Sequence, residues 1–550
     1  MNKKVCSFPI LFALLALLIG TCAVVFPASA QAVPTSTGSI TVSGTVARSY
    51  DAYQIFSANV VDGDSDAKIA TDLAWASDAA LPVLHSAGMP NSQATAQEAA
   101  EWLTTDSHLT SALSAQLARS LQNSGAVSVA LNAGTEAKLP CGYWLIVADD
   151  DAIAQGEAGT APIMALVGGS AVTVKPKAAT PKVSKHVLED STAAWQKAAD
   201  ATVADDLYWR LSATVPAGLT AYDTYTVRFV DTMSAGLDPS KVAASMRVYV
   251  AAGADGGFDA VSAGKDGRAG TDPAKGWTDI TAHCRVSVDG KTFTVCTDDL
   301  IAALGGADAF TAGVRVVAVY NAPLNSACNH GIAKGNPNEV YLRYPRSPFA
   351  DQSGDAGFTR TPSDDACAYT WDLALTKRGS DGDKPLAGAV LSIADDRGRT
   401  LAADGMWDAE GKATVTTGED GRVAVSGVDS GKLEVRELKA PKGYTAFEGT
   451  HSVTVKAEGL DVDQVAAAKP KLTITAESPL RADSADGSTG SLEASLINTP
   501  TGTPPSITTG GFMPSTGDMA MYAAAAAAVA GAALIVVALL VKRGGGSHKE

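Results

Sequence analysis

Hydrophobic and polar residues alternate with a period of two through most of the central part of the chain. Clear examples are the runs 207–215 (LYWRLSATV), 246–252 (MRVYVAA), 314–320 (VRVVAVY) and 339–344 (EVYLRY), which are rich in β-branched and aromatic residues. Turn residues, mostly Gly and Asp, separate these runs. Short alternating runs bounded by turn residues are typical of β-sandwiches. The pattern therefore predicts a mainly β protein built from tandem, immunoglobulin-like sandwich domains.

Changes in this pattern divide the chain into segments. An Ala-rich stretch at 93–121 has helical spacing and predicts a helical insertion within the first strand-rich segment. A Thr-, Pro- and Gly-rich linker follows the last strand-rich segment. The predicted domains are an N-terminal domain at 31–178, an Ig-like domain at 179–369, a smaller β domain at 370–500, and a linker with a short motif at 501–517.

The two ends of the chain have the composition of targeting segments. Residues 1–30 contain two lysines, an apolar run and a small-residue cleavage site, which together predict a secretory signal peptide. Residues 518–541 contain an uncharged stretch long enough to span a bilayer, and the tail 542–550 begins with two basic residues. The chain is therefore predicted to be exported and held transiently in the membrane.

Charge and motif content exclude several functions. The formal net charge of −16 leaves no basic surface for nucleic acid. The 7 histidines include no HExxH pattern, and no GxSxG surrounds a serine, so no enzyme acting on outside substrates is predicted. The stretch 62–73 imitates a calcium loop but has Ala67 and Leu73 where Gly and Glu are needed. We expect no metal and no cofactor.

The few cysteines that follow the signal do not form a disulfide scaffold. Cys284 and Cys296 flank two alternating runs around a Gly-containing turn. This arrangement predicts that they face each other across a hairpin and form a disulfide. A second bridge between Cys328 and Cys367 would leave Cys141 unpaired.

The short motif before the hydrophobic C-terminal segment resembles a cell-wall sorting signal of Gram-positive bacteria. Such a signal combines an LPxTG-type pentapeptide, an apolar span and a basic tail in this order, and here Met replaces Leu. The resemblance implies that a sortase cysteine attacks the carbonyl of the threonine, releases the glycine and passes the acyl group to an amine. The motif residues are Met513, Pro514, Ser515, Thr516 and Gly517.

The segment from 370 to 500 resembles the prealbumin-like domains of surface pilins, called CNA-B or SpaA-like domains. The resemblance is carried by LEVRELKAPKGY at 433–444, which is similar to the pilin E-box and has Leu433 in place of the first Tyr. In such domains a lysine of the first strand condenses with an asparagine of the last strand, promoted by an acid. By position, the resemblance implies Lys377 as amine, Glu437 as acid and Asn498 as acceptor. The alternative is that these residues have ordinary surface, turn and capping roles.

The segment from 179 to 369 is similar to the isopeptide-forming D2 domain of fimbrial proteins. The stretches ATPKVSKHV, YTVRFVDTM and NPNEVYLRY carry this resemblance. It implies Lys185 as amine, Asp231 as promoting acid and Asn338 as acceptor. Lys182 and Asn336 stand close enough to be the alternatives.

A polymer of such subunits also needs an acceptor lysine. Backbone pilins present it in a VYPK-like motif at the end of the first domain, and here Lys177 in VTVKPK takes this position, with Lys175 as the alternative.

Together these features predict a cell-wall-anchored shaft subunit of a sortase-assembled pilus. The expected partners are a pilus-class or housekeeping sortase, other copies of the chain, ancillary pilins, peptidoglycan and a host surface ligand. The alternative is a monomeric wall-anchored adhesin that binds a host ligand through its N-terminal domain.

Overall fold

The computed structural model describes residues 36–502, with gaps at 45–47, 65–66, 106, 150–152, 154–155, 158, 177–179, 217–220, 253–276, 307–312, 349, 351 and 353. The predicted signal peptide, Lys177, the sorting motif and the hydrophobic segment at 518–541 lie outside the described residues. No helix within this described part is both long and apolar enough to cross a membrane.

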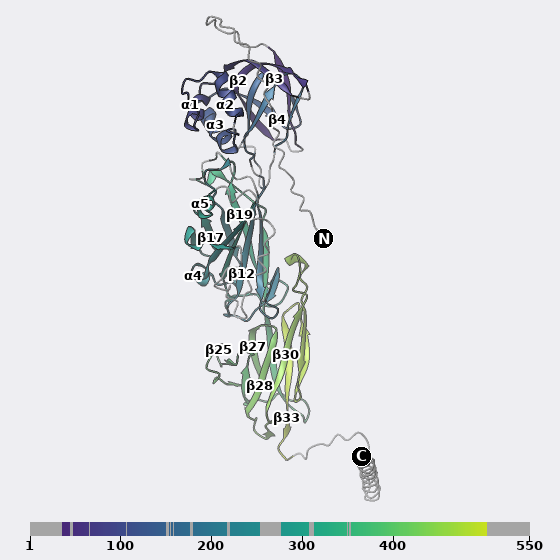
Figure 1. The fold of residues 1–550 in the computed structure, drawn as a ribbon. Coiled ribbons are helices and arrows are strands. Elements are labelled where there is room, and N and C mark those ends of the chain that lie inside the picture. The colour runs from purple at the N-terminus through teal and green to yellow at the C-terminus, as the bar shows by residue number, and fades with distance from the viewer. Residues whose placement is uncertain are drawn as a thin grey trace, which may run out of the picture.

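Three β-rich domains follow one another along an elongated molecule (Figure 1). Each domain contains two separate sheets, and helices occur mainly in the first domain. The prediction of a mainly β chain with several sandwich domains and few helices is confirmed.

The first domain has three layers. Its strands are β1 (Thr37–Val42), β2 (Ser49–Asp62), β3 (Lys68–Trp75), β4 (Ser128–Asn132), β5 (Glu136–Pro140), β6 (Gly142–Ala148), β7 (Ile163–Val167) and β8 (Val172–Val174). One sheet has the order β5–β1–β8, and the other has the order β3–β2–β6–β7 with β4 beside β2. Alternation along β6 separates two cores: Trp144 and Ile146 pack between the sheets, while Leu145 and Val147 pack under the helices.

The helices of this domain lie between β3 and β4 in the chain. They are α1 (Ala80–Ser86), α2 (Ala96–Thr104) and α3 (Ser111–Asn123). α2 begins with a capping box, in which Thr95 and Glu98 exchange hydrogen bonds, and Thr110 caps α3. These caps divide the predicted helical stretch 93–121 into two helices because a capping residue has extended rather than helical backbone.

The second domain is a sandwich of a six-stranded and a seven-stranded sheet. The first sheet has the order β10 (Ala194–Gln196), β9 (Lys182–Glu189), β12 (Tyr208–Val215), β18 (Val314–Asn321), β14 (Arg247–Ala252) and β15 (Thr278–Asp279). The second has the order β11 (Ala198–Asp200), β21 (Asp364–Tyr369), β19 (Asn336–Pro345), β13 (Arg228–Met233), β17 (Thr292–Thr297) and β16 (Cys284–Asp289), with β20 (Phe358–Arg360) beside β19. Two short helices, α4 (Val242–Ser245) and α5 (Leu300–Ala303), complete it. Trp209 and Leu211 from one sheet share a core with Phe229 and Leu342 from the other.

The third domain is a second type of sandwich. Its five-stranded sheet has the order β27 (Arg422–Val428), β22 (Trp371–Gly379), β33 (Ser491–Pro500) and β29 (Tyr444–Thr445), with β32 (Leu480–Asp486) beside β33. Its seven-stranded sheet has the order β25 (Trp407–Asp408), β24 (Thr400–Leu401), β23 (Val390–Ala394), β28 (Gly431–Lys439), β30 (Thr450–Glu458) and β31 (Lys471–Ala476), with β26 (Val415–Thr416) beside β23. The first and last strands of the domain, β22 and β33, are parallel neighbours.

The predicted disulfides are wrong in this structure. Cys284 and Cys296 do lie on the two strands of the β16–β17 hairpin, but both thiols are free. The register places Cys284 opposite Thr297 and Cys296 opposite Arg285, so the two cysteines are not directly opposed. A disulfide across a hairpin needs closely opposed Cβ atoms, which this one-residue offset does not provide. Cys328, Cys367 and Cys141 are also free.

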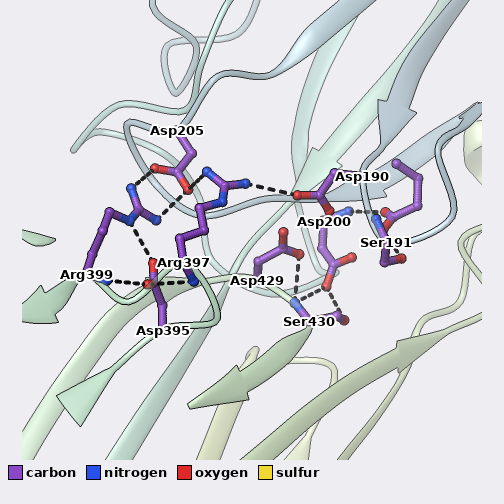
Figure 2. Close-up of polar contacts among 10 residues, drawn as sticks. Asp190, Ser191, Asp200, Asp205, Asp395, Arg397, Arg399, Asp429 and Ser430 are labelled. Carbon is purple, nitrogen blue, oxygen red and sulfur yellow. Dashed lines mark hydrogen bonds and ion pairs between the residues drawn. The ribbon is translucent and has the colours of Figure 1, made fainter. Parts of the chain in front are cut away.

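The junction between the second and third domains is strongly polar (Figure 2). Asp205 of the second domain forms an ion pair with two side chains of the third, Arg397 at 2.9 Å and Arg399 at 2.5 Å. Asp200 accepts hydrogen bonds from Trp371 Nε1 at 2.6 Å and from Ser430 Oγ at 2.5 Å. These contacts connect the two domains through charged and polar side chains from both.

Four carboxyl groups crowd this junction beside the ion pairs. Glu189 is only 3% exposed, and burial, aided by the charge of Asp200, raises its pKa to about 7. Burial also raises the pKa of Asp190, against the opposing effect of Arg397, and raises the pKa of Asp429 well above its ordinary value. Burial therefore makes the protonated forms of Glu189, Asp190 and Asp429 more accessible in the folded chain than in water.

We expect the junction to weaken as the pH rises. The pKa of Glu189 is near 4.3 in an unfolded chain and about 7 here. Its stabilising contribution, on the order of 3 kcal/mol, is therefore complete below about pH 4.3 and is lost as the pH rises through 7. Thermal unfolding at several pH values between 5 and 8 measures this effect.

Glu189→Gln should reduce the loss of stability between pH 5 and 8. Glu434→Gln is the matched control, because Glu434 is about half exposed and forms an ion pair with Lys432 at 3.1 Å. An equal pH dependence in wild type and Glu189→Gln would contradict the assignment.

Candidate functional site

The three residues predicted in the second domain meet between its two sheets. Lys185 lies on β9 of one sheet, while Asp231 on β13 and Asn338 on β19 belong to the other. The register pairs Asp231 with Val340 and Met233 with Asn338, so Asp231 and Asn338 are diagonal neighbours on the same face. All three side chains are fully buried. Alternation along β9 does not by itself determine which face is covered, and the opposing sheet buries Lys185.

The alternative residues named from the sequence have other positions. Lys182 is exposed at the start of β9. Asn336 is buried, but its side chain binds backbone groups: Oδ1 accepts from Asn329 N at 2.8 Å, and Nδ2 donates to Ala368 O at 3.2 Å. The buried cluster therefore contains Lys185 and Asn338.

The hydroxyl of Tyr320 on β18 connects the three side chains of this cluster. Lys185 Nζ donates to Tyr320 Oη at 2.9 Å and also to Asp231 Oδ2. Asn338 Nδ2 donates to Tyr320 Oη at 2.8 Å, and Tyr320 donates its proton to Asp231 Oδ2 at 3.1 Å. The sequence analysis did not identify Tyr320. Nearly every residue of β18 is buried, so its pattern does not indicate which side chains face the cluster.

Burial favours the uncharged forms of Lys185 and Asp231 in this cluster. It lowers the pKa of Lys185 to about 8, although the neighbouring Asp231 opposes this shift. Burial also raises the pKa of Asp231, against the effects of Lys185 and of its hydrogen bonds. A neutral amine beside a protonated carboxyl is consequently more accessible here than in water.

The three residues predicted in the third domain also meet between two sheets, in a different arrangement. Lys377 on β22 and Asn498 on β33 lie on adjacent parallel strands, where Lys377 pairs with Leu496 and Gly379 with Asn498. Glu437 reaches them from β28 of the opposite sheet. The side chains of Lys377 and Glu437 have no exposed surface, and Asn498 is 2% exposed.

In this second cluster the acid contacts the asparagine directly. Asn498 Nδ2 donates to Glu437 Oε1 at 3.0 Å and Oε2 at 2.9 Å, while Lys377 Nζ donates to Asn498 Oδ1 and lies 3.3 Å from Glu437 Oε1. Phe447, which the sequence analysis did not identify, donates its backbone N–H to Glu437 Oε2 at 3.1 Å. Burial lowers the pKa of Lys377 to about 8, with Glu437 opposing the shift.

The other predicted sites lie at the edge of the described residues or beyond it. Lys175 is exposed just after β8, and Lys177 lies outside the described residues, as do the sorting residues 513–517. No group of three or more His, Cys, Asp or Glu side chains within the described ranges could hold a metal ion.

Comparison with known proteins relates this chain to a class of surface proteins. Residues 372–469 match the family model of the SpaA prealbumin-like fold domain. A stretch of 143 residues is 30% identical to the trypsin-resistant surface T6 protein of Streptococcus pyogenes and covers 24% of each chain. The chain is similar to Gram-positive backbone pilins. This similarity was predicted from the motifs and is confirmed.

Solved structures of such pilins show the same resemblance at low identity. The T6 backbone pilin of Streptococcus pyogenes is 17% identical, with a TM-score of 0.47 over 85% of this chain and 98% of that one. The full-length major pilin SpaD of Corynebacterium diphtheriae is 16% identical, with a TM-score of 0.42 over 86% of this chain and 100% of that one. The full-length major pilin RrgB of Streptococcus pneumoniae is 13% identical, with a TM-score of 0.36 over 68% of this chain and 85% of that one.

Proposed function

We propose that this chain is the shaft subunit of a covalently polymerised, cell-wall-anchored pilus, stabilised by two internal Lys–Asn isopeptide bonds. The observation that carries the proposal is the pair of buried clusters, each with one lysine, one acid and one asparagine. A buried charge without a structural or chemical role would destabilise the fold. Two clusters of the same composition in different sandwich types therefore favour a shared chemistry.

The reaction in each cluster is an amide exchange. The neutral lysine Nζ attacks Cγ of the asparagine, a C–N bond forms, and the original Cγ–Nδ2 bond breaks to release ammonia. The acid takes a proton from the amine and returns one to the departing nitrogen, so the carboxyl is regenerated. The reaction requires a neutral amine and a nearby acid. Burial lowers the pKa of each lysine, which favours the neutral amine, and an acid lies beside each one.

Two unsatisfied atoms support a protonated acid in the second domain. Asp231 Oδ1 and Asn338 Oδ1 are buried acceptors without a hydrogen-bond donor. A proton on Asp231 Oδ1 would supply a donor to this region and could polarise the amide carbonyl during attack.

The positions of the bonds suit a protein that bears tension. In the third domain the bond would join the first strand, β22, to the last strand, β33, across 121 residues. In the second domain it would join β9 to β19 and close a loop of roughly 150 residues, worth about 5 kcal/mol on the chain-entropy model. Pulling force would pass through these covalent links and bypass most of the sheets.

Polymerisation and anchoring are proposed from the sequence and its similarity to surface pilins. A sortase would join the Thr516 carbonyl of one subunit to Lys177 of the next, and a last transfer would attach the polymer to peptidoglycan. Other copies of the chain, ancillary pilins and a pilus-class or housekeeping sortase are then its partners. Adhesion would follow from surface display.

The first prediction of this proposal concerns intact mass. Full-length chain should weigh two ammonia molecules less than its sequence, because each bond releases one. Asp231→Ala and Glu437→Ala should each restore one ammonia, and each should lower the unfolding free energy by about 5 kcal/mol. Mass spectrometry with peptide mapping identifies which bond is lost.

Asp238→Ala is a suitable control, because Asp238 caps a turn in the same domain with no contact to the cluster. A wild-type chain with no mass deficit would rule out both bonds.

The second prediction concerns the polymer. Lys177→Arg should abolish the ladder of high-mass species on denaturing gels of cell-wall extracts, because a guanidinium cannot serve as the acyl acceptor. Lys175→Arg is the matched control and should leave the ladder unchanged. The reverse result would assign the acceptor role to Lys175. A wild type without any ladder would favour the monomeric adhesin.

A further inference from the structure

We propose that the Tyr320 hydroxyl relays the proton from Asp231 to the departing amide nitrogen of Asn338. The inference rests on the proposed isopeptide chemistry and adds a catalytic residue to it. Three described hydrogen bonds meet at this one oxygen. Lys185 Nζ and Asn338 Nδ2 donate to it, and the hydroxyl itself donates to Asp231 Oδ2. The hydroxyl thus contacts both reacting nitrogens and the acid.

Comparison of the two clusters shows why a relay is needed only in the second domain. Glu437 places both carboxylate oxygens within 3.0 Å of Asn498 Nδ2, so it can protonate that nitrogen directly. Asp231 is one methylene shorter and forms no direct hydrogen bond with Asn338 in the described structure; its Oδ2 contacts Lys185 and Tyr320 instead. Tyr320 Oη occupies the position between acid and amide nitrogen.

The surrounding core holds the phenol ring in this position. Tyr320 is fully buried, and its ring meets Phe293 edge to face at a centroid distance of 4.7 Å. Phe293 lies directly opposite Asp231 in the β13–β17 register. The strand that carries the acid and the ring that carries the hydroxyl are therefore packed against the same phenylalanine, which limits their relative motion.

The proton transfers balance without any outside reactant. Attack by neutral Lys185 on Cγ of Asn338, beside the protonated Asp231 carboxyl, makes Nζ cationic. In the tetrahedral adduct Nδ2 becomes basic, so the phenol turns its proton to Nδ2 while its oxygen takes the proton of the Asp231 carboxyl. The carboxylate left on Asp231 then takes one proton from Nζ. The Cγ–Nδ2 bond then breaks and ammonia leaves. The net change is one proton moved from amine to ammonia, with Tyr320 and Asp231 restored.

Tyr320→Phe tests the relay, because it removes only the hydroxyl. Full-length chain is made by cell-free synthesis, samples are quenched in denaturant at intervals, and the fraction of Lys185–Asn338 cross-linked peptide is measured by mass spectrometry. The expected result is a rate of bond formation about 100-fold lower than in wild type, in line with the loss of a proton-transfer group. The Lys377–Asn498 bond should form at the wild-type rate in the same molecules.

Tyr344→Phe is the control for loss of a buried hydroxyl, since Tyr344 lies in the same core but donates to Glu157 O at 2.8 Å.

The double variant Asp231→Glu with Tyr320→Phe should recover part of the lost rate, because the longer acid can reach the amide nitrogen as Glu437 does. A merely structural role for Tyr320 would give no such recovery.

Three outcomes separate the relay from the underlying function. An unchanged rate in Tyr320→Phe overturns the relay while leaving the isopeptide bond intact. A wild-type chain without Lys185–Asn338 cross-link refutes the proposed bond itself. If Tyr320→Phe fails to fold, 3-fluorotyrosine at position 320 keeps the hydroxyl but makes the phenol more acidic, so the relay predicts a shifted pH dependence of bond formation. A pH–rate profile identical to that of wild type would then overturn the relay.

Discussion

The cost of burying a lysine ammonium between two β-sheets is the constraint on which the second and third domains depend. An isolated charge in such a place would be strongly unfavourable, so each lysine needs an acid and an amide beside it. The packing of the sheets supplies them: Lys185 has Asp231 and Asn338, and Lys377 has Glu437 and Asn498. The same burial that creates the cost lowers the pKa of both lysines and favours the neutral amine.

The two clusters reach this arrangement through different topologies. In the second domain the acid and the asparagine share a sheet and the lysine crosses from the other, whereas in the third domain lysine and asparagine share a sheet and the acid crosses. The acid is hydrogen-bonded directly to the asparagine in the third domain, whereas in the second domain both contact the hydroxyl of Tyr320. A similar composition therefore permits two proton routes, direct through Glu437 and indirect through Tyr320.

Polar contacts also determine how the domains are joined. Between the second and third domains, ion pairs from Asp205 to Arg397 and Arg399 lie beside carboxyl groups whose pKa values are raised by burial. Acids with raised pKa values thus lie close to ion-paired acids at one junction. The free cysteines contribute no covalent link to it, since Cys328 and Cys367 are not bonded. Hydrogen bonds and ion pairs therefore contribute to the contact between these two domains.

The mainly β architecture and the helical insertion could be predicted from the residues, because strand alternation and helical spacing are local features. The candidate lysines, acids and asparagines followed from the resemblance to pilin domains. Tertiary structure alone decided which of these residues are buried together. Lys185 alternates with its neighbours in a way that fits either face of β9, and only the opposing sheet makes its face the inner one. The roles of Tyr320 and Phe447, and the offset of Cys284 from Cys296, depend on strand register and sheet packing, which join residues far apart in the chain.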